Sequence, residues 1–152
     1  MKARLRILTG LTMAMLAGCE APQTGTQAMP PRPPEQTIQA PAEKVRLAAI
    51  KTMSERGGYV LTPVGADTLV FDRKAEFGST VGSSLVYGKE AWRRVRVRLV
   101  PVGGATLVTA EPSLVVDRGT TFEREEADTS DNAGKVMREI LGKIQGEAQG
   151  SG

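Results

Sequence analysis

Apolar residues recur at helical spacing in two segments of the chain. The first segment follows Pro41, which suits the first turn of a helix, and ends at Gly57-Gly58. Its apolar face consists of Val45, Ala48, Ala49, Thr52 and Met53. The second segment can be capped by Thr129, Ser130 or Asp131, and its apolar stripe consists of Val136, Met137, Ile140, Leu141 and Ile144. The spacing therefore predicts a helix near each end of a folded domain.

Between these helices, apolar and polar positions alternate as they do in strands. Tyr59–Pro63 and Thr68–Lys74 are predicted to be two strands joined by a turn. Trp92–Val102 and Ala105–Val116 flank Gly103-Gly104, which is a strong signal for a hairpin turn. The central part of the chain is therefore predicted to form an antiparallel sheet.

The two longest strands also predict their own register. Counting outward from the glycine turn, Val97 meets Ala110 on an apolar face, and Arg96 meets Glu111 on the opposite face. Pro112 cannot donate a backbone hydrogen bond. We therefore expect it to interrupt the second strand or to place that strand at an edge of the sheet.

These elements predict an α+β domain over residues 42–147. An antiparallel sheet of about four strands would pack against two helices, in the order α-β-β-β-β-α. The polar stretch 118–128 is expected to be a solvated linker, and residues 148–152 a frayed tail. In element order the domain resembles those of lipoprotein C of the outer-membrane β-barrel assembly machinery and of small uncharacterised envelope lipoproteins. That resemblance implies a fold and assigns no functional residue.

The chain begins with features of a secretory signal. Residues 1–18 have a basic head, a short apolar stretch and small residues before Cys19, and the apolar stretch is too short to span a bilayer. Leu16-Ala17-Gly18-Cys19 resembles the lipobox of bacterial lipoproteins. The resemblance implies cleavage between Gly18 and Cys19, diacylglycerol on the Cys19 thiol and an acyl group on the new amine. The alternative is an ordinary signal peptide with a chance cysteine.

The residue after the cysteine bears on the choice of membrane. Glu20 stands where many inner-membrane lipoproteins of Gram-negative bacteria carry Asp. We therefore expect an outer-membrane anchor that faces the periplasm, with the inner membrane as the alternative. Residues 19–41 are rich in Pro, Gln and Thr and are predicted to form a disordered tether. Pro30–Pro34 could be a ligand for a proline-recognising module, but a spacer is the simpler interpretation.

The composition limits which binding and catalytic functions we expect of this chain. The formal charge is +3, and removal of Lys2, Arg4 and Arg6 with the signal leaves 17 cations against 17 anions. A neutral mature chain gives no indication of nucleic-acid binding. The chain has no His, and its single Cys would carry lipid, so the usual nucleophile and base pairs are missing. We expect no enzyme activity, no metal and no cofactor other than the covalent lipid.

A cluster of carboxylates is the remaining source of catalytic groups. Its members are Glu123, Glu125, Glu126, Asp128 and Asp131. A carboxylate-based hydrolase or a calcium site could use them, although their spacing matches no calcium loop. A solvated linker that leads into the last helix is the favoured interpretation.

Two surfaces are candidates for partner binding. Arg94, Arg96 and Arg98 alternate on one face of a strand and could bind phosphate or carboxylate groups. The alternative is a solvent face with ordinary cross-strand ion pairs. The Gly- and Ser-rich segment 77–88 carries apolar side chains that could order on binding or could cover the end of the sheet. Its candidate contact residues are Phe77, Leu85 and Tyr87.

Together these features predict a non-enzymatic, membrane-anchored envelope lipoprotein. Its domain would bind an envelope protein, as an accessory module of an assembly. The alternative is a periplasm-facing protein that binds a lipid or another small apolar ligand in a pocket between the helices and the sheet.

Overall fold

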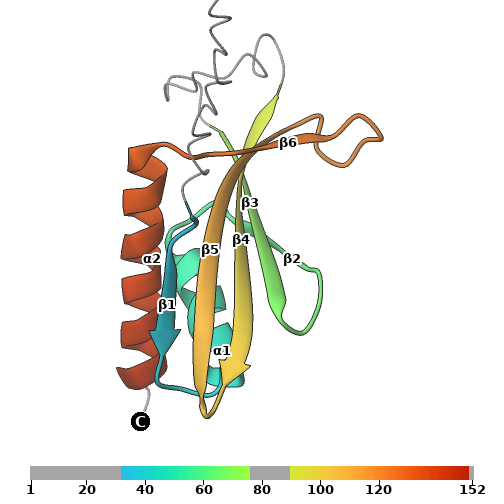
Figure 1. Ribbon diagram of the computed structural model, residues 1–152. Helices are drawn as coiled ribbons and strands as arrows, with labels where there is room; N and C mark the ends of the chain where they lie inside the picture. Colours follow the sequence, from blue (N-terminus) through green and yellow to red (C-terminus); the bar gives the residue numbers. More distant parts are fainter. Residues whose placement is uncertain (1–31, 76–89, 151–152) are drawn as a thin grey trace, which may run out of the picture.

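The computed structural model describes residues 32–75 and 90–150, and within them it forms one sheet flanked by two helices (Figure 1). The strands are β1 (Glu35–Ile38), β2 (Val60–Pro63), β3 (Thr68–Lys74), β4 (Ala91–Val102), β5 (Ala105–Val116) and β6 (Arg124–Ala127). The helices are α1 (Ala42–Glu55) and α2 (Asp131–Gly150). The order of the strands in the sheet is β1-β5-β4-β3-β2, and β6 pairs with β5 beyond the end of β1. The predicted α+β class with two helices is confirmed, but the described part of the sheet has six strands, not about four.

The β4–β5 hairpin has the predicted register. Val97 faces Ala110 and Arg96 faces Glu111, as counted from the glycine turn. Strand β5 continues through Pro112, so the prediction of an interruption is wrong. The alternative of an edge strand is wrong as well, because β5 pairs with β4 on one side and with β1 and β6 on the other. Pro112 lies between the segment of β5 that pairs with β1 and the segment that pairs with β6. Its carbonyl accepts a hydrogen bond from the Asp128 N–H, so the position of the missing N–H also points to this side and the pairing with β4 loses no bond.

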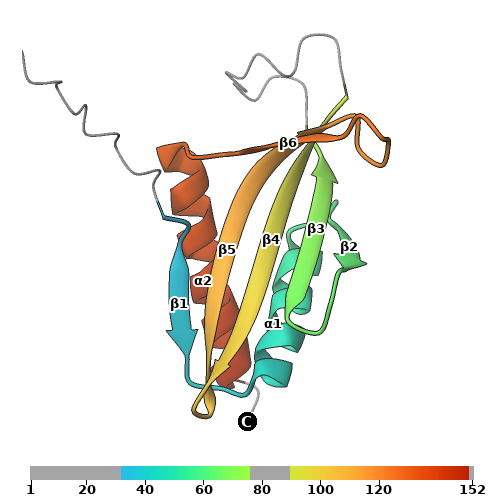
Figure 2. The ribbon, with the colours of Figure 1, turned by 45° about the vertical axis from the view of Figure 1, so that its right-hand side comes forward.

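Both helices cover the same face of the sheet, which Figure 2 shows with α1 and α2 behind the strands. The predicted apolar face of α1 is buried at all five positions. Helix α2 buries Met137, Ile140, Leu141 and Ile144, while Val136 is half-buried. These residues pack on Leu69, Phe71, Val95, Val97, Leu99 and Val108 from the three central strands. The sheet alternation thus supplies one apolar layer, and the two helices complete the core between them.

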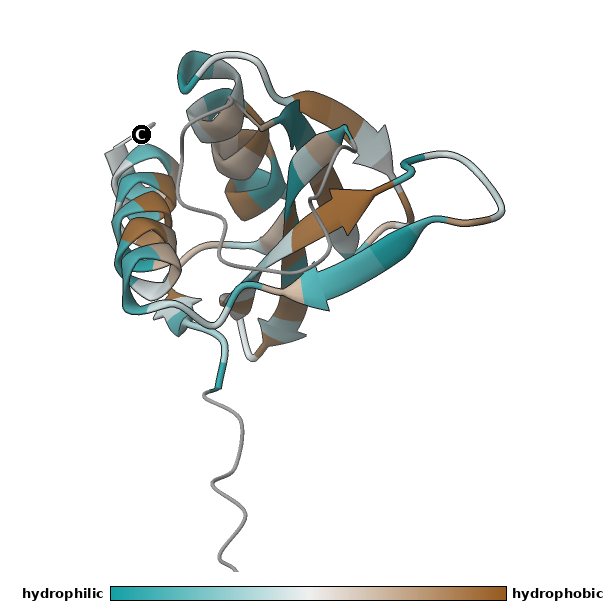
Figure 3. Ribbon diagram, turned by 90° about the horizontal axis from the view of Figure 1, so that it is seen from above, coloured by the Kyte–Doolittle hydropathy of each residue, from teal (hydrophilic) through white to brown (hydrophobic). Residues whose placement is uncertain are grey.

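The two strands missing from the sequence prediction lie on β5. Residues 35–38 fall within the predicted tether, so that prediction is wrong for the segment that forms β1. Ile38 of β1 is fully buried in the core. Strand β6 lies in the stretch predicted to be a linker, and all four of its residues are exposed. Figure 3 shows how hydrophilic β6 is beside the apolar strands.

The last helix is longer than predicted. Helix α2 continues to Gly150 instead of fraying from residue 148, and Ala148 is buried. Lys51 of α1 forms an ion pair with Glu147 at 2.5 Å, and Gln36 of β1 donates a hydrogen bond to Gln145. The end of α2 is therefore held by contacts with α1 and β1. No helix in the described ranges is long and apolar enough to cross a membrane.

Candidate functional site

The predicted arginine stripe lies on the face of the sheet away from the helices, and its first member is engaged inside the domain. The Arg94 side chain is only 12% exposed. Its guanidinium donates to both carboxylate oxygens of Asp72 (2.8 and 3.2 Å), to Glu123 (2.7 Å) and to Glu125 (2.9 Å). These bonds raise the pKa of Arg94 above its ordinary value, with Asp72 as the main cause. Arg94 is therefore occupied by internal carboxylates.

Asp72 is the buried centre of this network, with 1% of its surface exposed. It stands directly opposite Arg94 in the sheet register and also accepts a hydrogen bond from Arg118 Nε at 2.7 Å. The Arg118 guanidinium lies over the Trp92 ring at 4.5 Å. Burial alone would raise the pKa of Asp72, but the bonds from Arg94 and Arg118 outweigh it and lower that pKa. Asp72 therefore stays ionised because two cations enclose it.

The carboxylates that suggested a hydrolase belong to the same network. The pKa of Glu123 is lowered mainly by a hydrogen bond from the Gly119 N–H, and a hydrogen bond from Arg94 lowers it further. Burial opposes the same shift in Glu125, but bonds from the Ser113 hydroxyl and from Arg94 lower its pKa as well. A general acid at neutral pH needs a raised pKa, so this arrangement does not favour acid catalysis at these two residues.

The other two stripe residues are more open. Arg96 reaches Glu125 at 3.2 Å and its predicted partner Glu111 at 3.7 Å. Arg98 is exposed and faces Thr109 across the hairpin. The predicted stripe is therefore a real geometric feature, and it becomes less occupied by carboxylates from Arg94 to Arg98.

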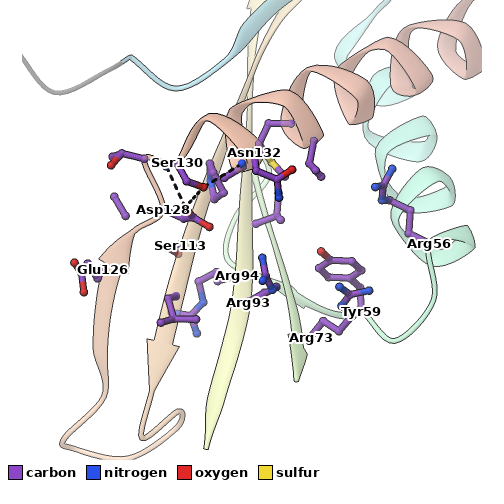
Figure 4. A pocket seen from close by; sticks show the side chains of 18 residues that line it. Arg56, Tyr59, Arg73, Arg93, Arg94, Ser113, Glu126, Asp128, Ser130 and Asn132 are labelled. Atoms are coloured by element: carbon purple, nitrogen blue, oxygen red, sulfur yellow. Dashed lines mark hydrogen bonds between the residues drawn. The ribbon is translucent and has the colours of Figure 1, made fainter. Parts of the chain in front are cut away.

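A pocket of about 930 Å³ lies on the opposite face, where the sheet extends past the helical core. Its walls come from the upper parts of β3, β4 and β5, from β6 and from the start of α2 (Figure 4). Apolar side chains line one part of it, including Val95, Leu114, Val136 and Met137. Four arginines also line it, namely Arg56, Arg73, Arg93 and Arg94, and the Arg94 guanidinium is the one held by Asp72, Glu123 and Glu125.

Arg73 and Arg93 stand directly opposite each other in the β3–β4 register. Like charges in opposed positions destabilise a sheet. Within the described part of the chain, neither side chain has a carboxylate partner or a side-chain hydrogen bond, and Arg73 Nε is buried without an acceptor. Arg73 instead lies over the Tyr59 ring at 5.1 Å. Two uncompensated cations therefore share this part of the pocket.

The acids around the pocket are placed away from this pair or are already engaged. Asp128 Oδ1 accepts hydrogen bonds from the Ser130 N–H (3.1 Å) and hydroxyl (2.7 Å), and Ser130 in turn caps α2 at the Ala133 N–H. Figure 4 shows Glu126 across the pocket from Arg73 and Arg93. Arg56, the third cation, is paired with Glu139 at 3.0 Å, which lowers the pKa of that carboxyl.

The sequence contained a signal for this pair that our prediction did not use. The inward positions of β3 run through Leu69 and Phe71 to Arg73, and those of β4 run from Leu99 through Val95 to Arg93. The same alternation that defines the apolar face therefore places two arginines at its end. Arg94, Arg96 and Arg98 alternate within one strand, whereas Arg73 and Arg93 are far apart in the chain and are brought together only by the β3–β4 pairing.

Several predicted residues lie outside the described ranges. They are Gly18 and Cys19 of the proposed lipidation site, and Phe77, Leu85 and Tyr87 of the segment 77–88. Within those ranges, no group of three or more acidic or cysteine side chains is arranged to hold a metal ion. No protein-family model matches this chain, and no curated protein is significantly similar to it.

Proposed function

We propose that this protein is a lipid-anchored, non-enzymatic binding protein of the bacterial cell envelope. Cleavage after Gly18 would leave Cys19 with diacylglycerol on its thiol and an acyl group on its amine. The residue Glu20 favours the outer membrane, with the domain facing the periplasm. The sheet begins at Glu35, so residues 20–34 connect it to the anchor and could span at most roughly 50 Å. The domain would therefore work close to the membrane surface.

The observation that carries the binding function is the pocket beside Arg73 and Arg93. It combines a ligand-sized volume, an apolar wall and two cations that the described residues leave uncompensated. Pockets with a mainly apolar lining and a few placed polar groups are typical of small-molecule sites. This supports our alternative hypothesis, a small-ligand binder, more strongly than the accessory assembly module.

A protein-binding role is the second candidate, and the edge strand β2 favours it. Among the described strands, β2 pairs with β3 alone, and Val60 is 54% exposed. Val64, which follows β2, is 65% exposed. An extended segment of a partner could add to such an edge through backbone hydrogen bonds.

The anchor is tested by intact mass. The full-length protein from its native membrane and a Cys19→Ala variant should be compared. We expect the native mass to equal the chain from Cys19 plus acyl groups, and the variant to lack these groups. A native mass without acyl groups would refute the anchor.

The binding role is tested by photo-crosslinking in living cells. A photoreactive residue should be placed at Asn132 on the pocket rim, at Val60 on the β2 edge, and at Lys143, an exposed position on α2, as a control. A low-mass adduct at Asn132 alone would support the pocket. A protein adduct at Val60 alone would favour the second candidate, and equal labelling at all three positions would contradict both.

A further inference from the structure

The geometry points to a specific ligand chemistry for the pocket: a phosphate group carried by a molecule with an apolar portion. This inference deepens the binding function proposed above and rests on it. It starts from the arrangement of Arg73 and Arg93, because no carboxylate of the described residues neutralises either guanidinium.

Charge favours phosphate over a single carboxylate. A phosphate monoester carries a charge of about −1.5 to −2 at neutral pH and offers three acceptor oxygens, whereas a carboxylate carries −1 and offers two. Two opposed guanidiniums can donate to separate oxygens of one phosphate. A dianionic group would therefore compensate both charges at once.

Position supports the same chemistry. The pocket includes the start of α2, a helix of 20 residues, with Asn132 and Ala133 in its lining. The positive end of the helix dipole favours an anion there, although Ser130 already caps one of its N–H groups. Tyr59 stacks on Arg73 and so holds that guanidinium within the pocket.

Volume and lining argue that the phosphate is part of a larger molecule. The pocket of about 930 Å³ is several times larger than a phosphate ion, and Leu114, Val136 and Met137 line it. Those side chains would contact an apolar portion of the ligand. Either a lipid headgroup with its proximal chain or a small phosphorylated molecule has this chemistry.

The test is calorimetric titration of the full-length chain in a non-ionic detergent at low ionic strength. The probes are inorganic phosphate, dihexanoyl phosphatidic acid and acetate, and dihexanoyl phosphatidylcholine controls for partition into the detergent. We expect both phosphate probes to bind, and acetate to bind at least about tenfold more weakly.

The variants assign the binding to the pocket. Arg73→Gln and Arg93→Gln should each weaken phosphate binding about tenfold or more, because each removes charge-assisted hydrogen bonds. Arg93→Lys keeps the charge without the planar fork and should retain part of the affinity. Arg98→Gln removes the same charge from the same strand on the opposite face and should leave binding unchanged.

The outcomes separate the ligand source from the ligand chemistry. Tighter binding of dihexanoyl phosphatidic acid than of phosphate supports a lipid headgroup with its proximal chain. Equal binding would show that the pocket takes the phosphate of a small molecule without apolar contacts, and would overturn the apolar portion of the inference. Equal binding of acetate, no binding of either phosphate probe, or an equal loss in Arg98→Gln overturns the inference. The inference would then fail even if Asn132 still captured a ligand in cells, so its failure is distinct from that of the proposed binding function.

Discussion

Arg93 and Arg94 are neighbours in β4, and their side chains lie on opposite faces of the sheet. Arg94 reaches three carboxylates, one of them the buried Asp72. Arg93 faces Arg73 and has no carboxylate partner among the described residues. Because a buried charge costs free energy unless it is paired, the two arginines should contribute differently to stability.

Substitution of Arg94 by Gln should destabilise the fold. Asp72 would keep Arg118 but lose its partner in the register, and Glu123 and Glu125 would lose a shared donor. We expect the free energy of unfolding to fall by about 2–3 kcal/mol, somewhat below the cost of breaking a fully buried pair. Urea unfolding at pH 7 measures this change. Arg98→Gln is the control and should change it by less than about 0.5 kcal/mol.

Substitution of Arg93 by Gln should leave stability unchanged or increase it. It removes the repulsion with Arg73, which is worth roughly 0.2–1 kcal/mol for opposed like charges. The same urea experiment measures the effect. A loss of more than about 1 kcal/mol would mean that Arg93 has a stabilising role in the folded domain, and the pocket would then lose its main argument for an external anion.

For the helices and strands, the sequence predicted those features that are determined within one contiguous segment of the chain. The β4–β5 register followed from one glycine turn and two alternating patterns, and the buried face of α1 followed from its own spacing. Strands β1 and β6 could not be found in this way. One buried side chain, Ile38, is all that β1 adds to the core, and β6 has none, so neither segment carries an apolar period. Their pairing is determined by the partner strand β5, which is distant in the chain.

For the candidate site, the sequence predicted the positions of the arginines on one strand but not the carboxylates that pair with them. Alternation along β4 was enough to place Arg94, Arg96 and Arg98 on one face. Their carboxylate partners could not be predicted, because Asp72 lies on β3 and the β6 carboxylates depend on a pairing that the sequence does not show.

Strand β1 should be a stabilising part of the domain. Ile38→Ala removes a fully buried side chain from between the sheet and the helices, and we expect the free energy of unfolding to fall by about 2–4 kcal/mol. Thr37→Ala, at the exposed neighbouring position, should cost less than about 0.5 kcal/mol. Thermal unfolding of both variants measures the difference, and equal midpoints would contradict a stabilising role for β1.

In the whole molecule, the two faces of one sheet have different charge balance. The face away from the helices pairs Arg94 with carboxylates from three sources: β3, β6 and the connection before β6. The helix-covered face is apolar until the sheet extends past the core, and there it presents Arg73 and Arg93 to a pocket. The first face therefore contributes stability, and the second presents the charges on which the proposed binding function rests.

The paired face should also determine how the domain responds to acid. Asp72, Glu123 and Glu125 have folded-state pKa values below their ordinary values of 3.8 and 4.5. As the pH falls through those ordinary values, the unfolded chain takes up protons that the folded domain does not. Stability should therefore be constant above about pH 5.5 and decrease below about pH 5, by about 1.4 kcal/mol per pH unit for each extra proton that the unfolded state binds.

Arg94 links these three carboxylates, so its substitution tests the origin of the acid response. In Arg94→Gln the pKa values of Glu123 and Glu125 should move back toward 4.5, and the difference in bound protons between folded and unfolded states should shrink. Urea unfolding between pH 3 and pH 7 should then show a shallower acid slope than in the unsubstituted protein, starting from a lower stability at pH 7. Arg98→Gln should keep the original slope. If Arg94→Gln also kept the original slope, the carboxylates that cause the acid response would lie outside this network, because their pKa values would not depend on Arg94.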